Sequence, residues 1–149
     1  MPFVELIIPR GALNEDQRRR IGGDLVTEIM RAEGAPDTAA ARAISWLVVN
    51  EIDEFWIGGR RWSEQDGARY VVRVGVPQGA LTDEKRTDMV ERVTKVLAQV
   101  DPQPQRLTEE PVAWVHINEV PEGNWGAQGK IVRLRDIWAL VNSSDVTTK

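Results

Sequence analysis

The hydrophobic residues of this chain follow two patterns in turn, one typical of strands and one typical of helices. Two short runs rich in β-branched residues, Phe3 to Ile8 and Tyr70 to Val76, each end at a Pro-x-Gly turn, which is typical of strands. Apolar residues at helical spacing follow each run and predict two amphipathic helices. These apolar positions are Ile21, Leu25 and Ile29 in the first helix and Met89, Val93, Val96 and Leu97 in the second.

Both predicted helices have clear start and stop signals. Asn14 is placed as the N-cap of the first helix, with acidic residues in the first turn and Gln17 at the capping-box position. Thr82 occupies the same place before the second helix. Gly34 ends the first helix and Pro102 stops the second.

A second strand follows each helix, from Ile44 to Glu51 and from Val112 to Glu119. In a β-α-β unit the two strands are parallel and the helix covers one sheet face. We therefore expect an α+β fold with a four-stranded sheet and two helices on one face. The opposite face would be bare, and apolar residues on it predict contact with other subunits. These residues are Trp46, Val48, Trp114 and Ile117.

The two strand-helix-strand segments are copies of each other. Segment 9–13 reappears as segment 77–81, 68 residues later, with four of its five residues unchanged. The same offset, without a gap, superposes Arg18 on Arg86, Trp46 on Trp114, Asn50 on Asn118, Glu51 on Glu119 and Gly58 on Gly126. Several matches in one register indicate an internal duplication.

This duplication predicts one domain spanning residues 1–149. It would consist of a first repeat (2–60), a second repeat (70–128) and a C-terminal tail (129–149). The tail has many apolar residues between 131 and 141, which indicates a segment for packing or for oligomer contact.

Composition excludes several classes of function. The chain has 149 residues, of which 42% are hydrophobic and 28% charged, with a net charge of −4. It lacks cysteine, which excludes disulfides and thiolate chemistry, and its single histidine cannot form a multi-histidine metal site. The mild acidity argues against nucleic acid as a partner. No apolar run is long enough to span a bilayer and no secretory signal is evident, so we expect a cytoplasmic protein without metal or cofactor.

Pro2 is the candidate catalytic residue. Methionine is ordinarily removed before a small residue such as proline, and its removal here would leave a secondary amine as the new N-terminus. An α-amino group titrates near ~8 in water, and burial disfavours its charged form. Such an amine can be neutral at pH 7 and act as a general base without any side chain. The alternative is that Met-Pro simply begins a strand.

A β-α-β unit of this size that begins with proline and ends in a glycine-rich hairpin resembles the tautomerase superfamily. The motifs are the Met-Pro start, the helix capped at Asn14, the Asn-Glu-Ile strand end at 50–52 and the segment 55–59, which is similar to the family's aromatic-x-Ile-Gly-Gly hairpin. The resemblance covers Pro2 to about Gln128. It is closest to 4-oxalocrotonate tautomerase and its double-length relatives, which include the cis-3-chloroacrylic acid dehalogenases and malonate semialdehyde decarboxylases.

The resemblance implies a homotrimer of fused β-α-β pairs, with Pro2 as general base or acid in a pocket between neighbouring units. The substrate would be a small carboxylate or oxo acid. Tyr70 stands at the equivalent place in the second repeat, so only one prolyl site per chain is possible. The arginines by which the family binds its substrates fall at Ala12 or Leu13, at Trp46 and Trp114, and, for the dehalogenases, at Pro77 and Ala80.

Other residues could replace these arginines. Arg10 lies close to the first of these positions, so we treat it as a substitute and as a candidate for substrate binding. His116 shares strand parity with Trp114, and in the dehalogenases that position carries a tyrosine directed at the substrate. His116 could hydrogen-bond a carbonyl or enol oxygen, or it could be satisfied at a subunit interface.

Arg73 lies inside a strand that should be largely covered, so its charge needs a partner. That partner could be a substrate, or it could be Glu5 at the equivalent position of the first repeat. Phe55 and the tryptophans, among them Trp114, could form the wall of an apolar pocket or pack an interface. The repeated pair Glu51 and Glu119 is interpreted as structural.

Two functions follow from these residues. The first is an isomerase in which Pro2 removes a proton next to a carbonyl and Arg10 stabilises the enolate oxygen with help from His116 or Arg73. The second is a non-catalytic trimeric scaffold or small-ligand binder that kept the fold. A ferredoxin-like dimeric barrel is a third interpretation, which a dimer in solution would favour.

Overall fold

A mixed four-stranded sheet, in the order β2-β1-β5-β6, forms the centre of the protein in the computed structural model, which describes residues 1–143 and leaves 144–149 of the predicted tail outside. The strands are β1 (Phe3–Pro9), β2 (Trp46–Ile52), β5 (Tyr70–Pro77) and β6 (Ala113–Val120). β2 pairs in parallel with β1, and β6 in parallel with β5. The two repeats meet at the centre of the sheet, where β1 and β5 are antiparallel.

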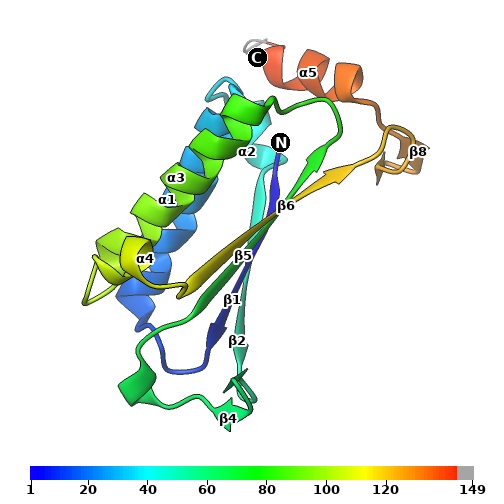
Figure 1. The fold of residues 1–149 in the computed structure, drawn as a ribbon. Coiled ribbons are helices and arrows are strands. Elements are labelled where there is room, and N and C mark those ends of the chain that lie inside the picture. The colour runs from blue at the N-terminus through cyan, green and yellow to red at the C-terminus, as the bar shows by residue number, and fades with distance from the viewer. Residues whose placement is uncertain (144–149) are drawn as a thin grey trace.

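Two long helices, α1 (Glu15–Glu33) and α3 (Asp83–Val100), lie side by side on one face of the sheet (Figure 1). Each helix connects the two parallel strands of its own repeat, as a β-α-β crossover requires. The predicted α+β fold, with a four-stranded sheet and two helices on one face, is therefore confirmed. No helix within residues 1–143 combines the length and the apolar character needed to cross a membrane.

The ends of the helices follow the predicted signals. Asn14 and Gln17 form a capping box, with both hydrogen bonds at 2.8 Å. Gly34 ends α1 in the left-handed conformation, with φ of 77°, which costs glycine little. The hydroxyl of Thr82 accepts a hydrogen bond of 3.2 Å from the backbone N–H of Lys85 at the start of α3.

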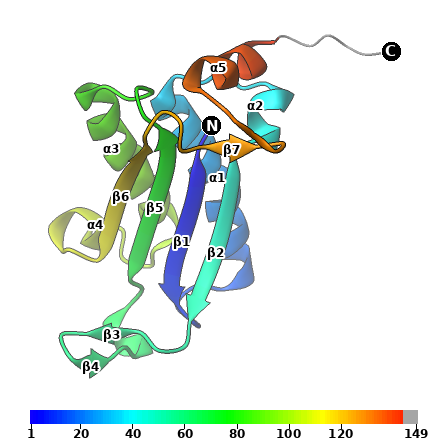
Figure 2. The ribbon, with the colours of Figure 1, turned by 90° about the vertical axis from the view of Figure 1, so that its right-hand side faces the viewer.

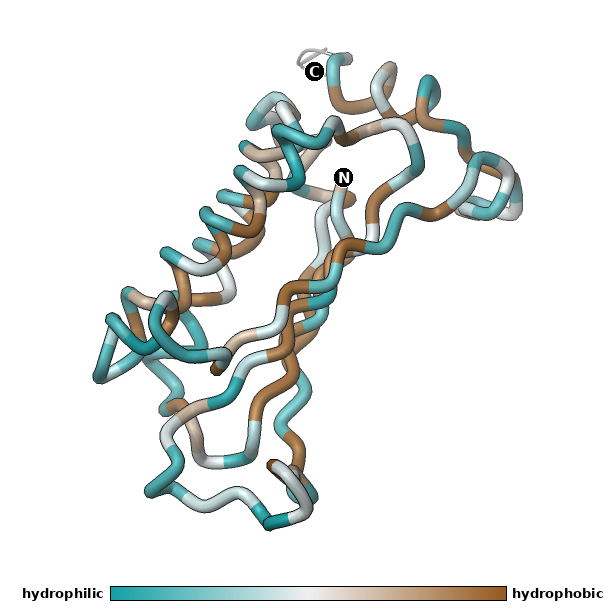
Figure 3. The backbone as a smooth tube through the Cα atoms, viewed as in Figure 1, coloured by the Kyte–Doolittle hydropathy of each residue, from teal (hydrophilic) through white to brown (hydrophobic). Residues whose placement is uncertain are grey.

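The core lies between the sheet and the two helices. Alternate residues of the central strands point into it, and the brown, hydrophobic positions in Figure 3 run along the strands and the facing sides of the helices. The fully buried members include Val4, Leu6, Ile8, Val72, Val74, Ile21, Leu25, Met89 and Leu97. The predicted apolar positions of both helices are thus confirmed as core.

The other face of the sheet carries no helix among the described elements, and it faces the viewer in Figure 2. Large apolar side chains are exposed on it, with Trp46 at 65%, Trp114 at 59% and Phe3 at 42% exposure. This is the bare face that the sequence predicts, with the exception of Ile117, which packs against the core instead.

Short elements complete the fold. They are helices α2 (Ala39–Ala43) and α4 (Arg106–Glu109), a 3₁₀ turn (Glu64–Asp66), and the hairpins β3 (Trp56–Ile57) with β4 (Arg60–Arg61) and β7 (Gly126–Ala127) with β8 (Lys130–Ile131). The tail forms α5 (Leu134–Asn142), whose buried Ile137 and Val141 pack with Met30 of α1 and Ala41 of α2. The described part of the tail therefore packs against its own chain.

One ion pair in each repeat joins the crossover helix to the second strand. Arg18 lies 3.1 Å from Glu51 in the first repeat, and Arg86 lies 2.8 Å from Glu119 in the second. The duplication therefore preserved both partners of this pair. This geometry agrees with the structural interpretation of the two glutamates.

Replacing Arg18 or Arg86 by alanine is expected to lower the free energy of unfolding by about 0.5–1 kcal/mol each, because both pairs are partly exposed to solvent. Urea unfolding measures this change. Arg19→Ala is the matched control, since Arg19 pairs with Glu15 in full solvent and should cost less than about 0.5 kcal/mol. A loss above about 2 kcal/mol in either repeat would contradict this view of the pair.

Candidate active site

Pro2 lies at the entry to the central strand β1, and it is buried. Its carbonyl oxygen accepts a hydrogen bond of 3.1 Å from the backbone N–H of Trp46, which begins β2. The start of the chain lies next to α2 and beneath α5 (Figures 1 and 2). The sheet therefore holds Pro2 in a fixed and covered place.

Glu33, the last residue of α1, binds the amino group of Met1. The ammonium donates a hydrogen bond to Oε2 of Glu33 and forms an ion pair with it. Glu33 is only 2% exposed, and its other oxygen, Oε1, has no hydrogen-bond partner within residues 1–143. Burial raises the pKa of Glu33, while the N-terminal ammonium and Lys85 act in the opposite direction.

A small cavity of about 10 Å³ lies beside Met1 and Glu33. The other lining residues are Ala35, Pro77, Ala80, Leu134, Ile137, Trp138 and Val141. A cavity of this size has room for about one water molecule. The Met1 side chain is 9% exposed and lines this cavity, and it packs with Ile137 and Val141 of α5, so removal of Met1 would enlarge the cavity at the start of the chain.

Arg73 and His116 are cross-strand neighbours on the bare face of the sheet. Arg73 forms an ion pair of 3.5 Å with Glu5, which also accepts a hydrogen bond of 2.6 Å from the side-chain amide of Asn50. Of the two predicted partners of Arg73, the structure therefore provides Glu5. His116 is exposed beside this pair.

Trp114 lies on the same face, beside Val71 of β5. Pro2 has the strand parity of the buried residues Val4 and Leu6, so it belongs to the side of the sheet that carries the helices. The structure thus brings Arg73, His116 and Trp114 together, but on the opposite side of the sheet from Pro2 of the same chain.

Arg10 and Phe55 lie at the other end of the sheet. Arg10 directly follows β1, so the length of this strand, roughly 20 Å for its seven residues, separates it from Pro2. Arg10 donates a hydrogen bond of 2.5 Å to Asp53, which raises the pKa of Arg10, and it also lies 3.4 Å from Glu51. Within one chain, neither predicted residue approaches the proline.

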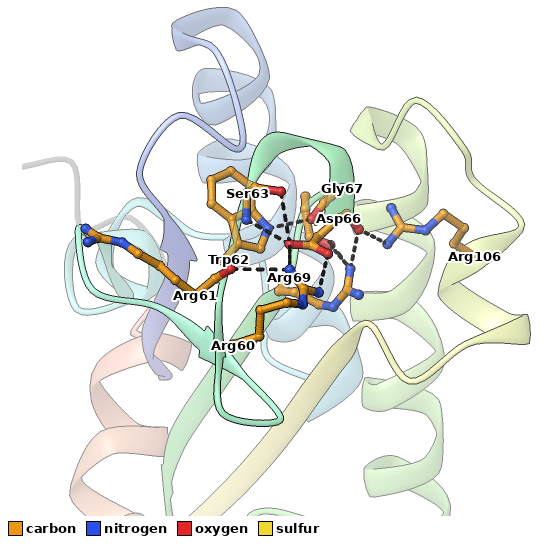
Figure 4. A network of polar contacts seen from close by, with 9 residues as sticks. Arg60, Arg61, Trp62, Ser63, Asp66, Gly67, Arg69 and Arg106 are labelled. Carbon is orange, nitrogen blue, oxygen red and sulfur yellow. Dashed lines mark hydrogen bonds and ion pairs between the residues drawn. The ribbon is translucent and has the colours of Figure 1, made fainter.

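The cavity of about 560 Å³ at that end of the sheet is polar. Figure 4 shows the adjoining network, in which the two side-chain oxygens of Asp66 accept hydrogen bonds of 2.6 and 3.0 Å from Arg60. These bonds hold the pKa of Asp66 well below its usual range. Arg69 and Arg106 donate to the backbone oxygen of Asp66 at 2.7 and 3.1 Å. These three arginines hold the loop between the repeats in place, so we interpret the network as structural.

A metal-based site has no support in the described part of the chain. There, no three side chains of the histidine, cysteine, aspartate or glutamate type lie close enough to bind a metal ion together. The chemistry available near Pro2 is that of an amine, a buried carboxylate and an apolar wall.

Residues 71–135 match the family model named Tautomerase, which is described as a tautomerase enzyme. This segment contains β5, α3, β6 and the β7–β8 hairpin, and so it covers most of the second repeat. The curated proteins include no sequence match to this chain.

Solved structures share the fold across most of the chain. A fused 4-OT, described as an asymmetric trimer, is 18% identical, with 87% of this chain and 94% of that chain covered at a TM-score of 0.68. A member of the cis-3-chloroacrylic acid dehalogenase family is 22% identical, with 87% and 82% covered at a TM-score of 0.66. A macrophage migration inhibitory factor-like protein from Entamoeba histolytica is 14% identical, with 88% and 98% covered at a TM-score of 0.64.

The sheet, the two crossover helices and the buried chain start thus define a tandem β-α-β protein with the tautomerase fold. The ferredoxin-like alternative is not supported, because the fold matches that of fused 4-OT structures. The predicted resemblance to the tautomerase superfamily is confirmed, with the family's sequence pattern in the second repeat and its fold in both.

Glu33 was not among the site residues predicted from the sequence. A signal for it exists, because Glu33 continues the apolar ladder of Ile21, Leu25 and Ile29 at intervals of four residues. A carboxylate on the apolar side of a helix is unusual, since a buried charge needs a partner. That partner came from the start of the chain, which helical spacing does not predict.

Proposed function

We propose that this protein is a tautomerase-type isomerase whose catalytic group is the secondary amine of Pro2, formed when Met1 is removed. The amine would act as general base and acid on a 2-oxo or enol carboxylate, moving a proton between carbon and oxygen. The observation that carries this proposal is the burial of Pro2 at the start of the central strand, directly after Met1, which lines a small covered cavity under α5.

The family supports the same assignment. The matching family model is described as a tautomerase enzyme, and the fold is shared with fused 4-OT and with a cis-3-chloroacrylic acid dehalogenase family member. Residues that line the pocket under α5 are apolar apart from Glu33, which suits an amine whose protonation is controlled by its surroundings.

The proposed substrate carries a carboxylate, and the pocket of a single chain has no arginine in its lining. We therefore propose a homotrimer in which a neighbouring chain supplies the cation. Arg10 is suitable because its side chain is 59% exposed at the end of β1. Arg73, His116 and Trp114 also belong to this proposal, because their bare face is the one we assign to contact between chains. The fused 4-OT structures described as trimers support this assembly.

Pro2→Ala is expected to lower kcat/KM for enol-keto conversion by up to about a hundredfold, roughly the contribution of general acid–base catalysis, because a freely rotating primary amine replaces the secondary amine that the ring holds in place. Phenylpyruvate-like enols and 2-hydroxydienoates are the test substrates, followed by absorbance. Alanine is also small enough for removal of Met1, so both proteins would expose an α-amino group. This group is the secondary amine of the proline ring in the wild type and a primary amine in the variant.

Intact mass of the purified protein has to accompany this assay. A mass lower by one methionine residue supports the proposal, whereas retained Met1 turns the Pro2 nitrogen into an amide and excludes it as a base. Thr27→Ala on the outer side of α1 is the control, and it should keep the wild-type rate. Equal rates for wild type and Pro2→Ala would remove Pro2 from the mechanism.

A non-catalytic trimeric scaffold is the second candidate function. It is favoured by the use of Arg10 and Arg73 in ion pairs with carboxylates of their own chain, which leaves their charges partly neutralised. Trimeric protein that lacks Met1 yet shows no turnover of any test substrate would favour this alternative.

A further inference from the structure

Glu33 lies where neither helix stability nor packing favours a carboxylate. It is the last residue of α1, and the end of a helix carries partial negative charge that repels an anion. It is also buried, with Oε1 unpaired within the described residues. A buried carboxylate with an unused oxygen destabilises a fold, so its presence calls for another explanation.

The second repeat shows what this position does when it is purely structural. The 68-residue offset that relates the repeats places Asp101 on Glu33 and Tyr70 on Pro2. Asp101 is buried at the end of α3, and it accepts a hydrogen bond of 2.9 Å from the Tyr70 hydroxyl. Its other oxygen accepts one of 2.8 Å from the backbone N–H of Gln103. Both repeats thus direct an acid at the start of their first strand, and only the second satisfies both oxygens.

Removal of Met1 would leave the Glu33 carboxylate without its present partner. The nitrogen of Pro2 is three bonds from that of Met1, so the two atoms are at most about 4 Å apart. Lys85 is the other nearby cation, but its ammonium donates to the backbone oxygen of Glu33, at 3.1 Å. The remaining cavity lining from β5 and α5 is apolar. The new prolyl amine is therefore the group best placed to pair with the carboxylate.

We propose that Glu33 is the positioning residue of Pro2: in the chain that lacks Met1, its carboxylate accepts a hydrogen bond from the prolyl amine and holds that amine in its cationic form. This inference rests on the proposed function, because it needs the amine that removal of Met1 creates. In the first repeat the acid would then bind the catalytic amine, whereas in the second repeat the equivalent acid, Asp101, binds the Tyr70 hydroxyl.

The two groups control each other's charge. Burial favours the neutral form of Glu33, and the cations that oppose this effect are the N-terminal ammonium and Lys85. In return, an ionised carboxylate within hydrogen-bond distance favours the protonated amine. Pro2 would thus begin its reaction cycle as the general acid that donates a proton to the enol carbon, and it would become the general base of the proposed function once that proton has been transferred.

The test is an NMR titration of protein that lacks Met1 and carries ¹⁵N-labelled proline. Glu33→Gln is expected to lower the pKa of the Pro2 amine by about one unit or more, because it removes an adjacent negative charge. Glu33→Asp keeps the charge and should restore most of the shift. Glu28→Gln is the matched control, since it removes a carboxylate from the same helix that pairs with Arg31 and Arg92 instead.

A folded Glu33→Gln protein with the wild-type Pro2 pKa would overturn the proposal. If Glu33→Gln does not fold, the wild-type protein can be used for the test instead. A ¹³C titration of Glu33 and the ¹⁵N titration of Pro2 must share inflection points if the two groups are coupled. Independent titrations would overturn the proposal. Failure of the proposed function is seen separately, in the turnover of Pro2→Ala, which does not enter these titrations.

Discussion

Trp114→Asp is expected to convert the proposed trimer into monomers at micromolar concentration. Trp114 is 59% exposed in the single chain and lies on the bare face of the sheet. Burying a large aromatic side chain stabilises an interface by about 1.5–3 kcal/mol, so three copies lose roughly 5–9 kcal/mol per trimer. The new carboxylate adds a desolvation cost. Light scattering coupled to size-exclusion chromatography measures the change in mass.

Val90→Asp is the matched control for this prediction. It places the same charge on an exposed apolar residue of α3, on the helix side of the molecule, and should leave the mass of the assembly unchanged. Wild-type protein that is monomeric, or a Trp114→Asp protein that is still trimeric, would contradict the assignment of the bare face to subunit contact.

Asp101→Ala is expected to lower the free energy of unfolding by about 3–5 kcal/mol, the usual cost of removing one partner of a buried pair. The substitution leaves the Tyr70 hydroxyl without its acceptor. It also removes the carboxylate that lies 3.8 Å from the buried guanidinium of Arg106. Burial and the hydrogen bond to Asp101 raise the pKa of Tyr70, so this hydroxyl is a donor at all physiological pH values.

Urea unfolding with circular dichroism measures the loss caused by Asp101→Ala. Tyr70→Phe is the comparison, because it removes one hydrogen bond but keeps the carboxylate near Arg106 and Gln103. Its expected cost is about 1–2 kcal/mol, smaller than that of Asp101→Ala. Equal stability of wild type and Asp101→Ala would mean that the pair does not stabilise the second repeat.

The fold was predictable because its signals are local and occur twice. Asn14, Gln17 and Gly34 determine the ends of α1 by hydrogen bonds to neighbouring backbone groups, and such contacts can be inferred from short spacings. The duplication then identified the second unit, with Thr82 in the same role. The same offset superposes Trp46 on Trp114, and both lie on the bare face as predicted. The prediction was wrong for Ile117, which has the opposite strand parity to Trp114 and packs against the core.

The candidate site was only partly predictable because its contacts join distant parts of the chain. Pro2 could be selected from its position in the sequence, and the pairing of Arg73 with Glu5 was one of two predicted outcomes. The contact between Met1 and Glu33 depends on how α1 lies on β1, and the covering of both by α5 depends on the packing of the tail. Neither depends on a local pattern. The separation of Arg10 from Pro2 also follows from the direction of β1, not from their closeness in sequence.

The loop that joins the two repeats has a consequence for behaviour on dilution. Because β1 and β5 belong to one polypeptide, their antiparallel pairing is intramolecular, with an effective concentration in the millimolar range that does not fall when the sample is diluted. Contacts through the bare face, in contrast, obey mass action. A dilution series followed by unfolding experiments would therefore separate the two kinds of contact, with the four-stranded sheet persisting after any larger assembly has come apart.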